Sequence, residues 1–316
     1  MAILITGGSG VTGSSLTSAL VSRNEKVVIF DLWLDPSRGP KNELLVQAKG
    51  DITDWHAVLN VVKEYKIDSI FHLAAILTIP SEANPWGAIN TNAIGTYNIL
   101  EAARLFGVKK VIFTSSIGAY GVTQDTVVTE ETAQRPTNIY GCCKVFSELL
   151  GLYYHRKFGL DFRGIRVPQV VGPGVKNPGL GQYMPWLIEA AVKGEPFEVW
   201  VPEDTVMPML YVKDVIRSLV MLYDAPEEKM RTRMYNMGQI SPPPTAKELV
   251  DTVKSYYPGA RITFKPDPNL MPIIKTIPRV FKGDNAEAEW GWKFSYSLND
   301  MVKDFIEEVK KSGLRA

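Results

Sequence analysis

The stretch Ala2-Ile-Leu-Ile-Thr-Gly-Gly-Ser-Gly-Val-Thr-Gly13 decides the fold of this 316-residue chain. Residues 2–5 form a continuous apolar run, which is typical of a strand buried on both faces. Apolar residues then recur at helical spacing over residues 11–23. Where the strand passes into the helix, Gly7, Gly10 and Gly13 form the pattern G-x-x-G-x-x-G. Because glycine has no Cβ, the backbone of such a turn can approach a pyrophosphate at the helix N-terminus, so a dinucleotide-binding unit is predicted.

The second predicted strand ends in an acidic residue. It covers Lys26-Val-Val-Ile-Phe-Asp31, and Asp31 lies 18 residues after Gly13. A carboxylate at this position accepts hydrogen bonds from both adenosine ribose hydroxyls and repels a 2′-phosphate. Leu32-Trp33 follows without a basic pair nearby. We therefore expect NAD, rather than NADP, as the cofactor.

Strands and helices alternate over the first half of the chain, which predicts an α/β fold with a doubly wound parallel sheet of the Rossmann type. Beyond the second strand, the expected elements are strand 69–73, helix 93–106, strand 110–114, helix 140–158 and strand 161–167. Sixteen of the 21 prolines lie at or after Pro168, which favours a smaller, loop-rich C-terminal substrate lobe. The expected division is a dinucleotide-binding domain at 1–170, rejoined by about 208–238, and a substrate-binding lobe at 171–207 and 239–316.

Local signals also predict elements in the second half of the chain. Residues 209–212 form an apolar run followed by a helical pattern through Tyr223, which would rejoin the first domain. Thr245 and Glu248 fit a capping box at the start of a helix near 245–256. A small strand is expected near 261–264 and a closing helix near 298–310.

The composition excludes several classes of protein. Lys and Arg number 35 against 34 Asp and Glu, so no basic excess indicates nucleic-acid binding. With 45% hydrophobic residues the chain is too apolar for a disordered protein, yet it has no apolar run of about 18 residues that would span a membrane. The two cysteines, Cys142 and Cys143, are neighbours, and the N-terminus does not resemble a signal peptide. We expect a cytoplasmic protein with no nucleic-acid, membrane or metal partner.

Tyr140 and Lys144 are spaced i, i+4 on the predicted helix 140–158, so they share one face. A tyrosine acts as a base only if its pKa falls from about 10, and an adjacent ammonium lowers that pKa by stabilising the phenolate. A cationic nicotinamide would add to this effect. Ser115 and Ser116 follow the strand 110–114 at the carboxyl edge, where such sheets bind ligands. A hydroxyl there would hold a substrate oxygen beside the phenol.

With these motifs the chain resembles the extended short-chain dehydrogenases/reductases, the group that contains nucleotide-sugar epimerases and dehydratases. The resemblance covers nearly the whole chain and rests on Thr6-Gly-Gly-Ser-Gly-Val-Thr-Gly13, Gly50-Asp-Ile52, His72-Leu-Ala-Ala75, Asn92-Ala-Ile-Gly-Thr96, Thr114-Ser-Ser116, Tyr120-Gly121, Tyr140 with Lys144, Arg166-Val-Pro168 and Gly172-Pro173. It implies a catalytic set of Ser116, Tyr140 and Lys144. Ser116, rather than Ser115, matches because it stands four residues before Tyr120.

The same resemblance implies which residues bind NAD. Asp51 and Ile52 would flank the adenine, and Lys144 would also hold the nicotinamide ribose. Pro168 would contact the nicotinamide side, while Asn92 would order a water or a helix kink behind the site. The complete cofactor-binding set is Gly7, Gly10, Val11, Thr12, Gly13, Asp31, Asp51, Ile52, Leu73, Ala74, Ala75, Asn92, Thr114, Tyr140, Lys144 and Pro168.

One position separates the branches of this family. Nucleotide-sugar enzymes carry an arginine for the diphosphate where this chain has Met207, and a methionine cannot form that ion pair. Other segments resemble the short-chain-type L-threonine 3-dehydrogenases: Ala75-Ile-Leu-Thr78, Gly95-Thr-Tyr-Asn-Ile-Leu-Glu-Ala-Ala103, Ser116-Ile-Gly118, Glu148-Leu-Leu-Gly-Leu-Tyr-Tyr154 and Glu289-Trp-Gly291. In that group Thr78 would correspond to a hydroxyl that contacts the substrate.

The segment Gly179-Leu-Gly-Gln-Tyr183 departs from that group, which has Gly-Thr-Thr-Asp-Tyr there. Leu180 and Gly181 cannot make the threonine hydrogen bonds, so an altered, more apolar substrate is expected. The expected substrate contacts are Thr78, Ser116, Tyr140, Leu180, Gln182, Trp186 and Met207. Packing in the core of the lobe is the alternative for the large side chains of this region.

The expected activity is NAD-dependent oxidation of a small-molecule secondary alcohol, with Tyr140 as the base and hydride transfer to NAD. Two alternatives stay open: a nucleotide-sugar epimerase or dehydratase with recycled NAD, and a non-catalytic protein that senses NAD or acts as a scaffold. Helices 93–106 and 140–158 carry apolar residues beyond a single stripe. In this family such helices form a two-fold interface, so a homodimer is expected.

Overall fold

The computed structural model describes residues 2–35, 39–121, 127–176, 178–274 and 277–311. Its centre is a seven-stranded sheet in the order β3-β2-β1-β4-β5-β7-β11, and all neighbouring strands are parallel. The strands are β1 (Ala2–Thr6), β2 (Val27–Asp31), β3 (Leu45–Lys49), β4 (Ile67–His72), β5 (Lys110–Ser116), β7 (Asp161–Val167) and β11 (Met234–Asn236). The strand order reverses between β1 and β4, which is where doubly wound sheets bind ligands. The predicted fold class is confirmed.

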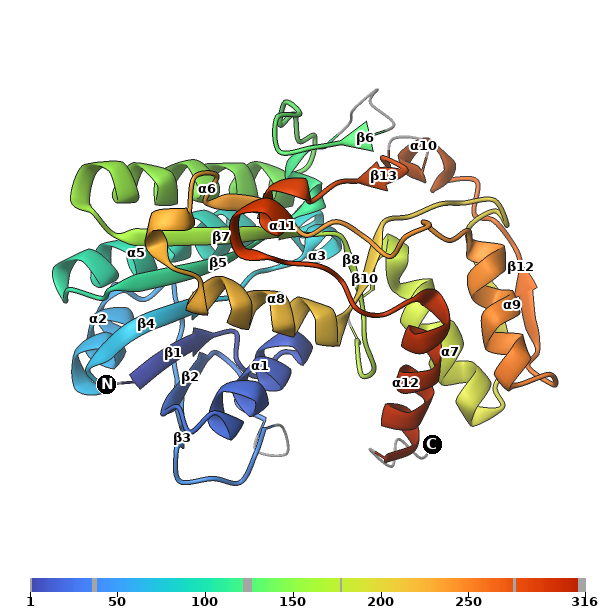
Figure 1. Ribbon diagram of the computed structural model, residues 1–316, viewed down its shortest axis with the longest axis horizontal. Coiled ribbons are helices and arrows are strands. Elements are labelled where there is room, and N and C mark those ends of the chain that lie inside the picture. The colour runs from blue at the N-terminus through green and yellow to red at the C-terminus, as the bar shows by residue number, and fades with distance from the viewer. Residues whose placement is uncertain (1, 36–38, 122–126, 177, 275–276, 312–316) are drawn as a thin grey trace.

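Helices cover both faces of this sheet (Figure 1). α1 (Val11–Ser22) packs beside α8 (Val212–Asp224) on one face. On the other face α5 (Gly95–Leu105) packs between α2 (Trp55–Glu64) and α6 (Ile139–Phe158). The sheet is therefore shielded from water on both sides, which leaves its carboxyl edge as the place for a site.

β1 shows why the first apolar run is continuous. Ile3 and Ile5 are buried in the apolar cluster that contains Leu16 of α1. Leu4 points to the opposite face and is buried in the cluster that contains Val58 of α2. Because successive side chains of a strand point to opposite faces, a strand with two covered faces needs an apolar residue at every position.

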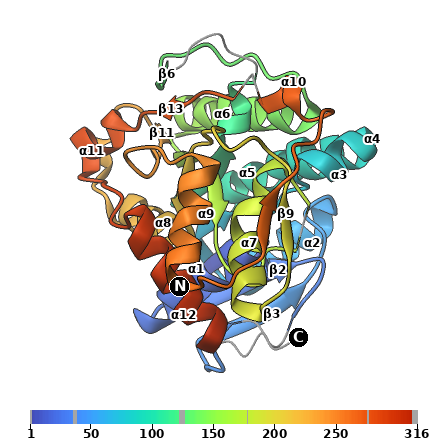
Figure 2. The ribbon, with the colours of Figure 1, turned by 90° about the vertical axis from the view of Figure 1, so that its right-hand side faces the viewer.

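The second lobe is built mainly from short pieces of the C-terminal half (Figure 2). Its helices α7 (Tyr183–Lys193), α9 (Ala246–Tyr256) and α12 (Leu298–Lys311) pack against one another. Three two-stranded parallel sheets accompany them: β8 (Gln169–Val171) with β10 (Met209–Tyr211), β9 (Phe197–Val199) with β12 (Ile262–Phe264), and β6 (Val127–Val128) with β13 (Val280–Phe281). The shorter helices are α3 (Thr78–Ala83), α4 (Pro85–Ala88), α10 (Met271–Ile274) and α11 (Asp284–Trp290).

The predicted elements are present with small changes. The helix expected at 93–106 begins earlier, as a π-helical turn at Ile89–Ile94 that continues into α5. The capping box of α9 forms between Thr245 and Glu248. β10 pairs with β8 rather than with the main sheet, whereas β11 extends the main sheet beside β7. None of the helices that the structure describes is long and apolar enough to cross a membrane.

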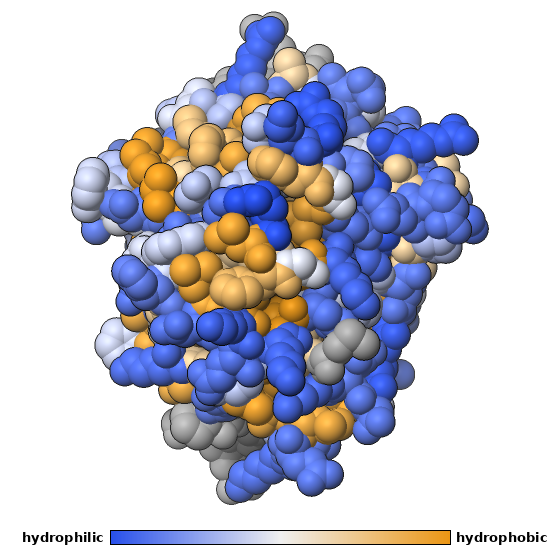
Figure 3. Space-filling model, turned by 90° about the vertical axis from the view of Figure 1, so that its left-hand side faces the viewer, coloured by the Kyte–Doolittle hydropathy of each residue, from blue (hydrophilic) through white to orange (hydrophobic). Residues whose placement is uncertain are grey.

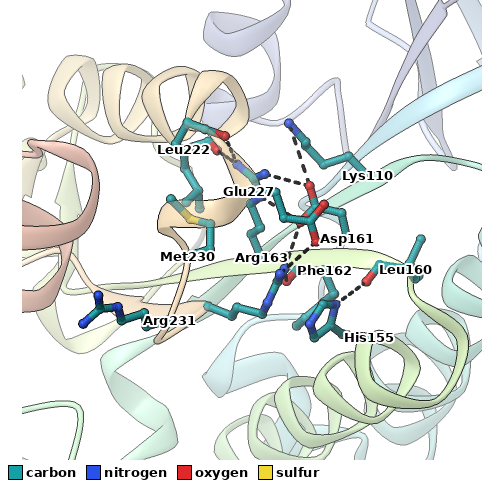
Figure 4. Close-up of polar contacts among 12 residues, drawn as sticks. Lys110, His155, Leu160, Asp161, Phe162, Arg163, Leu222, Glu227, Met230 and Arg231 are labelled. Atoms are coloured by element: carbon teal, nitrogen blue, oxygen red, sulfur yellow. Dashed lines mark hydrogen bonds and ion pairs between the residues drawn. The ribbon is translucent and has the colours of Figure 1, made fainter.

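A buried group of ion pairs closes the amino edge of the sheet (Figure 4). Asp161, the first residue of β7, accepts hydrogen bonds from Arg163 at 2.9 and 2.7 Å and from Arg233 at 2.9 Å. Arg163 also donates to the carbonyl oxygen of Leu222 in α8 at 2.7 Å. Lys110 Nζ, at the start of β5, lies 4.0 Å from Asp161. We call Lys110, Asp161, Arg163 and Arg233 the amino-edge cluster.

Candidate active site

The glycine turn lies at the switch point of the sheet. Gly7 follows β1 with a φ of +71°, a left-handed conformation that glycine adopts without steric cost. A Cβ on Gly7 would come within 2.8 Å of the Ala74 backbone nitrogen, and a Cβ on Gly13 would lie 2.3 Å from the Gly7 carbonyl oxygen. The turn is packed so closely that a side chain has no room at either position. The remaining predicted residues of the turn lead into α1: Gly10, Val11 and Thr12.

Asp31 ends β2 and its carboxylate lies against the glycine turn. Its Oδ2 accepts a hydrogen bond from the Ser9 backbone N–H at 3.0 Å, and its Oδ1 accepts one from the Trp33 N–H at 3.2 Å. Each carboxylate oxygen has a second lone pair, so both can still accept ribose hydroxyls. Asp51 and Ile52 follow β3, and Ile52 is buried.

A chain of hydrogen bonds ties the glycine turn to the helix behind it. Thr6 Oγ1 lies 2.7 Å from His72 Nδ1, and His72 Nε2 lies 2.9 Å from Thr96 Oγ1. The Thr96 hydroxyl donates to the Asn92 carbonyl oxygen at 2.7 Å, so it accepts from His72 Nε2, and Thr6 donates to Nδ1. Burial, together with the charge of Lys144, lowers the pKa of His72 to about 3. His72 is therefore neutral at physiological pH.

Asn92 lies in the π-helical turn and holds the segment that follows β4. Its side chain accepts a hydrogen bond from the Ile76 N–H at 2.8 Å and donates to the Ile76 carbonyl oxygen at 2.9 Å. The predicted cofactor residues Leu73, Ala74 and Ala75 are partly buried between β4 and this contact. Asn92 thus fixes the backbone that leads from the cofactor turn toward α3.

Ser116, Tyr140 and Lys144 meet at the carboxyl edge of the sheet. Ser116 ends β5, while Tyr140 and Lys144 lie one turn apart at the start of α6. A Cβ on Gly118 would lie 3.4 Å from Ser116 Oγ and 3.6 Å from the Tyr140 ring, so the two side chains flank this glycine. Lys144 Nζ donates to the Thr114 carbonyl oxygen at 2.7 Å and lies 5.5 Å from the centre of the Tyr140 ring.

Burial is the largest influence on the pKa values of Tyr140 and Lys144. It raises the pKa of Tyr140 to about 12, against a hydrogen bond from Ser116 that lowers it. Burial also lowers the pKa of Lys144 to about 8, against the charge of Glu148 that raises it. The sequence predicts a lowered pKa for Tyr140, but the groups of the chain alone do not produce it. More positive charge beside the phenol is required, and an oxidised nicotinamide ring carries such a charge.

Two predicted substrate residues lie in the turn that precedes α7. Gln182 is buried and Leu180 is partly buried. Between them, a Cβ on Gly181 would come within 2.5 Å of the Gln169 side chain, which directly follows the predicted nicotinamide contact Pro168. The turn therefore lies against the strand that leaves the cofactor site. The predicted substrate residue Thr78 is not part of this turn. It is exposed at the first position of α3.

Trp186 and Met207 have packing partners within the lobe. The Trp186 indole N–H donates to the Val175 carbonyl oxygen at 2.7 Å, and its ring packs edge-on against Trp200 at 5.8 Å. Met207 is 5% exposed and belongs to the apolar core that contains α7 and α8. These contacts favour the alternative of core packing for both residues.

The site fits a dinucleotide. The absence of side chains at Gly7 and Gly13 lets the turn pack closely at the start of α1, and the Asp31 carboxylate lies against this turn with lone pairs to spare. Thr114 Oγ1 is buried and, among the described residues, has no hydrogen-bond partner. A turn, an acid and a Ser–Tyr–Lys group in this arrangement define a dinucleotide-dependent enzyme of the short-chain dehydrogenase type.

Comparisons with known proteins identify the family. The sequence signature described as the NAD dependent epimerase/dehydratase family matches residues 3–238. The mitochondrial L-threonine 3-dehydrogenase of Bos taurus is 33% identical over 312 residues, which cover 96% of this chain and 81% of that protein. The chain belongs to the NAD-dependent epimerase/dehydratase family, and it is an enzyme with NAD as its cofactor.

Two solved structures extend this comparison. The L-threonine dehydrogenase of Clostridium difficile superposes with a TM-score of 0.89 at 33% identity, covering 99% of this chain and 98% of that one. A protein of metagenomic origin, described as a monomeric L-threonine 3-dehydrogenase, superposes with a TM-score of 0.88 at 29% identity. This superposition covers 98% of this chain and 99% of that protein.

The sequence did not single out three groups that line or support this site. Gly118 lies between Ser116 and Tyr140, and Gln169 covers Gly181. Behind them, Glu148 is buried one helical turn beyond Lys144. The signal for Glu148 was available, because it continues the i, i+4 spacing of Tyr140 and Lys144 along the helix.

Proposed function

We propose that this protein oxidises a secondary alcohol with NAD, as a dehydrogenase related to the L-threonine 3-dehydrogenases. The observation that carries the proposal is the convergence of Ser116, Tyr140 and Lys144 at the carboxyl edge, beside the glycine turn. A hydroxyl, a phenol and an ammonium at this place supply what oxidation of an alcohol requires from a protein: a hydrogen bond for the oxygen, an acceptor for its proton, and charge that stabilises the phenolate.

Each side chain has a separate part in the reaction. Ser116 holds the substrate oxygen, and Tyr140 removes the hydroxyl proton through its phenol oxygen. Lys144 is fixed by the Thr114 carbonyl oxygen and stabilises the phenolate as an ammonium. The neutral His72 adds no competing charge. When bound, NAD supplies the carbon that accepts the hydride and the positive charge of its nicotinamide ring.

The substrate is proposed to be more apolar than threonine. Leu180 replaces a hydroxyl with a branched apolar side chain, and Gly181 leaves space that the Gln169 side chain fills. Both changes remove hydrogen bonds to an amino acid, and a site without them discriminates poorly in favour of threonine. Gln169 and Gln182 supply amide groups in their place. We therefore expect a β-hydroxy acid or related alcohol with a larger apolar substituent.

The alternative of a nucleotide-sugar epimerase or dehydratase has less support. Met207 replaces the arginine that would bind the diphosphate, and it is buried in an apolar core. A buried methionine offers neither a charge nor a hydrogen-bond donor. A scaffold without catalytic activity is also disfavoured, because it would not need the three converging side chains.

The test is formation of NADH by the purified protein with a panel of substrates. The panel contains L-threonine, longer β-hydroxy acids, secondary alcohols with aromatic substituents, and nucleotide sugars. We expect turnover with at least one alcohol and a higher kcat/KM for apolar substituents than for threonine. Tight binding of NAD without turnover of any alcohol, together with a melting temperature raised by nucleotide sugars, would overturn the proposal in favour of the epimerase.

A homodimer through α5 and α6 is part of the proposal. Exposed apolar side chains follow these helices: Ile94, Tyr97, Leu105, Phe106, Phe146, Leu149, Tyr153 and Phe158. Figure 3 views the side on which α5 and α6 end, and apolar side chains gather in the middle of that face. Large apolar surface of this kind is typical of an interface. One solved relative of the same fold is described as monomeric, so the oligomeric state is tested directly.

Light scattering of the wild type and of Leu149→Asp tests the dimer. Leu149 is 58% exposed, so a charge there costs little in a monomer but would lie inside the interface. We expect a dimer mass for the wild type and a monomer mass for the variant. A monomer mass for the wild type at micromolar concentration would refute this part of the proposal.

The division of the chain and its location complete the proposal. We infer that residues 1–170, rejoined by 208–238, bind the cofactor, while 171–207 and 239–316 select the substrate. The packing of α8 beside α1 and the pairing of β11 with β7 support the return of the chain to the first domain. A cytoplasmic location is supported by the two cysteines, which are both free.

A further inference from the structure

A second buried ion pair lies directly behind the Ser–Tyr–Lys group. Glu148 is 1% exposed and Arg166 is 6% exposed. Arg166 Nη2 donates to Glu148 Oε2 at 2.7 Å, and its Nε donates to both carboxylate oxygens at 3.1 Å. The pair joins α6 to β7, and none of the roles assigned to the site so far uses it.

The pair makes further contacts, and one of them is to the residue that precedes Ser116. The Ser115 hydroxyl donates to Glu148 Oε1, and the Gln134 amide donates to Glu148 Oε2 at 2.8 Å. On the other side, Arg166 Nη1 donates to the Tyr120 hydroxyl oxygen at 2.8 Å. We call Ser115, Tyr120, Gln134, Glu148 and Arg166 the carboxyl-edge cluster.

The face of α6 that carries this pair contacts three consecutive residues of β5. Lys144 donates to the Thr114 carbonyl oxygen, Glu148 accepts from the Ser115 hydroxyl, and Tyr140 meets Ser116. The three helix residues are spaced four apart, so they form one stripe along α6. Glu148 is the only anion of this stripe, and it is held in place by the arginine behind it.

The charges around Lys144 are unevenly distributed. His72 of β4 is neutral, Thr114 of β5 offers a carbonyl dipole, and Tyr140 is protonated in the chain alone. Glu148 on α6 makes the largest contribution that favours the ammonium against the cost of its burial, and the adjacent Cys143 acts in the same direction. Arg166 compensates Glu148 from the far side of the carboxylate.

We propose that Glu148, fixed by Arg166, is a positioning residue for the dehydrogenase reaction: it orients the end of β5 that carries Ser116 and keeps the buried Lys144 charged. This inference rests on the proposed function, because it assigns a part in the same site. It gives Ser115 a role that differs from that of Ser116. Ser115 anchors the strand to the helix, whereas Ser116 faces the substrate.

Three variants separate the two effects. Glu148→Gln removes the charge and keeps the size of the side chain. Ser115→Ala removes the anchoring hydroxyl and keeps the charge. Because Glu148→Gln leaves Arg166 buried without its carboxylate, the double variant Glu148→Gln/Arg166→Met removes both charges and guards against a failure to fold.

The first measurement does not need turnover. Proteins with carbon-13 at the lysine Cε are titrated by NMR, and the Lys144 signal is identified by its loss in Lys144→Met. We expect a midpoint near the value of about 8 in the wild type and a midpoint about one unit lower in Glu148→Gln and in the double variant. Ser115→Ala should leave the midpoint unchanged. Equal midpoints in all folded variants would overturn the charge part of the proposal.

The second measurement is kcat against pH with a substrate from the panel. In Glu148→Gln the loss of activity at alkaline pH should begin about one unit lower than in the wild type, so that kcat at a given pH on the alkaline limb falls about tenfold. Ser115→Ala should lower kcat at every pH with an unchanged Kd for NAD. Unchanged kcat in Ser115→Ala would overturn the orienting part. If the wild type has no activity on any alcohol, the proposed function fails while the NMR result still decides the role of Glu148.

Discussion

The two edges of the sheet hold buried ion pairs of the same chemistry with different surroundings. The amino-edge cluster joins Asp161 to two arginines, and its spare donors go to backbone carbonyl oxygens at the end of α8. The carboxyl-edge cluster joins Glu148 to Arg166, and its other contacts go to Ser115, Gln134 and Tyr120. Glu148 also lies on the helix that carries Tyr140. One cluster therefore ties the fold together, whereas the other also reaches the reacting groups.

This difference shows that the role of a buried ion pair follows from its remaining contacts. Loss of one partner leaves an uncompensated buried charge in either cluster, so a single substitution destabilises the fold in both cases. Only substitutions in the carboxyl-edge cluster are expected to change the kcat of the folded enzyme. The following variants measure rate and stability separately, from the largest effect to the smallest.

The largest effect is expected from Tyr140→Phe at the carboxyl edge. Loss of the phenol oxygen removes the proton acceptor, so kcat should fall by about 10³-fold. The Kd for NAD and the free energy of unfolding should change little, because the ring remains. Steady-state kinetics, NAD titration and urea unfolding provide the three readouts. A variant with more than a tenth of the wild-type kcat would exclude Tyr140 as the base.

At the amino edge, Asp161→Asn should lower the free energy of unfolding and leave kcat almost unchanged. The substitution leaves the buried Arg163 without its carboxylate partner, while Arg233 keeps only its ion pair with Glu227. The free energy of unfolding should therefore fall by about 3 kcal/mol. The kcat of the folded fraction should stay within about twofold of the wild type, because none of the cluster contacts reaches Ser116 or Tyr140. A changed pH profile in this variant would break the distinction between the two edges.

The pH dependence of Lys144 should move activity and stability in opposite directions. Its pKa in the folded protein is about 8, below its ordinary value of 10.5, so the buried ammonium destabilises the fold. Between these two values the unfolded chain binds more protons, and the free energy of unfolding rises with pH. The gain is on the order of 3 kcal/mol at most. Over the same range kcat should fall as the ammonium is lost.

Lys144→Met is the reference for this prediction, because it lacks the titrating group. Urea unfolding of both proteins between about pH 7 and pH 10 isolates the contribution of Lys144 as their difference. A difference that does not change with pH would show that the ammonium is not penalised by burial. A kcat of Lys144→Met equal to that of the wild type across this range would contradict the role of Lys144 in stabilising the phenolate.

The smallest effect is expected from Asp31→Asn, which tests cofactor choice at the carboxyl edge. Removing the carboxylate charge removes its repulsion of a 2′-phosphate, so the ratio of Kd values for NADP and NAD should fall about tenfold. Asp51→Asn is a matched control that changes an acid beyond β3. An unchanged ratio in Asp31→Asn would show that Asp31 does not select NAD.

Much of the fold could be predicted because local pattern and tertiary role agree. The run 2–5 is apolar at every position, and the structure buries both faces of β1. The pairing of β10 with β8 could not be predicted, because three residues of apolar sequence fit either sheet. The family resemblance implied a water or a helix kink at Asn92, and the structure has a π-helical turn there. The hydrogen bonds of Asn92 with Ile76 could not be predicted, because the two residues are 16 positions apart.

The candidate site was predicted where spacing along one helix or one turn defines it. The i, i+4 spacing of Tyr140 and Lys144 and the strand that ends in Ser116 suffice to bring the three together. Residues of the substrate lobe could not be assigned in this way. Trp186 and Met207 were expected to contact the substrate, yet their neighbours in the lobe give them packing partners. In a sequence, a large apolar side chain is equally compatible with packing in a core and with lining a pocket.

Transfer of deuterium is the most direct test of the central claim, that this site oxidises an alcohol with NAD. The preferred alcohol of the panel, deuterated at its carbinol carbon, is incubated with NAD and the enzyme, and the released NADH is analysed by mass spectrometry. The account predicts one deuterium in the NADH released by the wild type and almost no NADH from Tyr140→Phe. An altered substrate that retains its deuterium, with no NADH released, would contradict it.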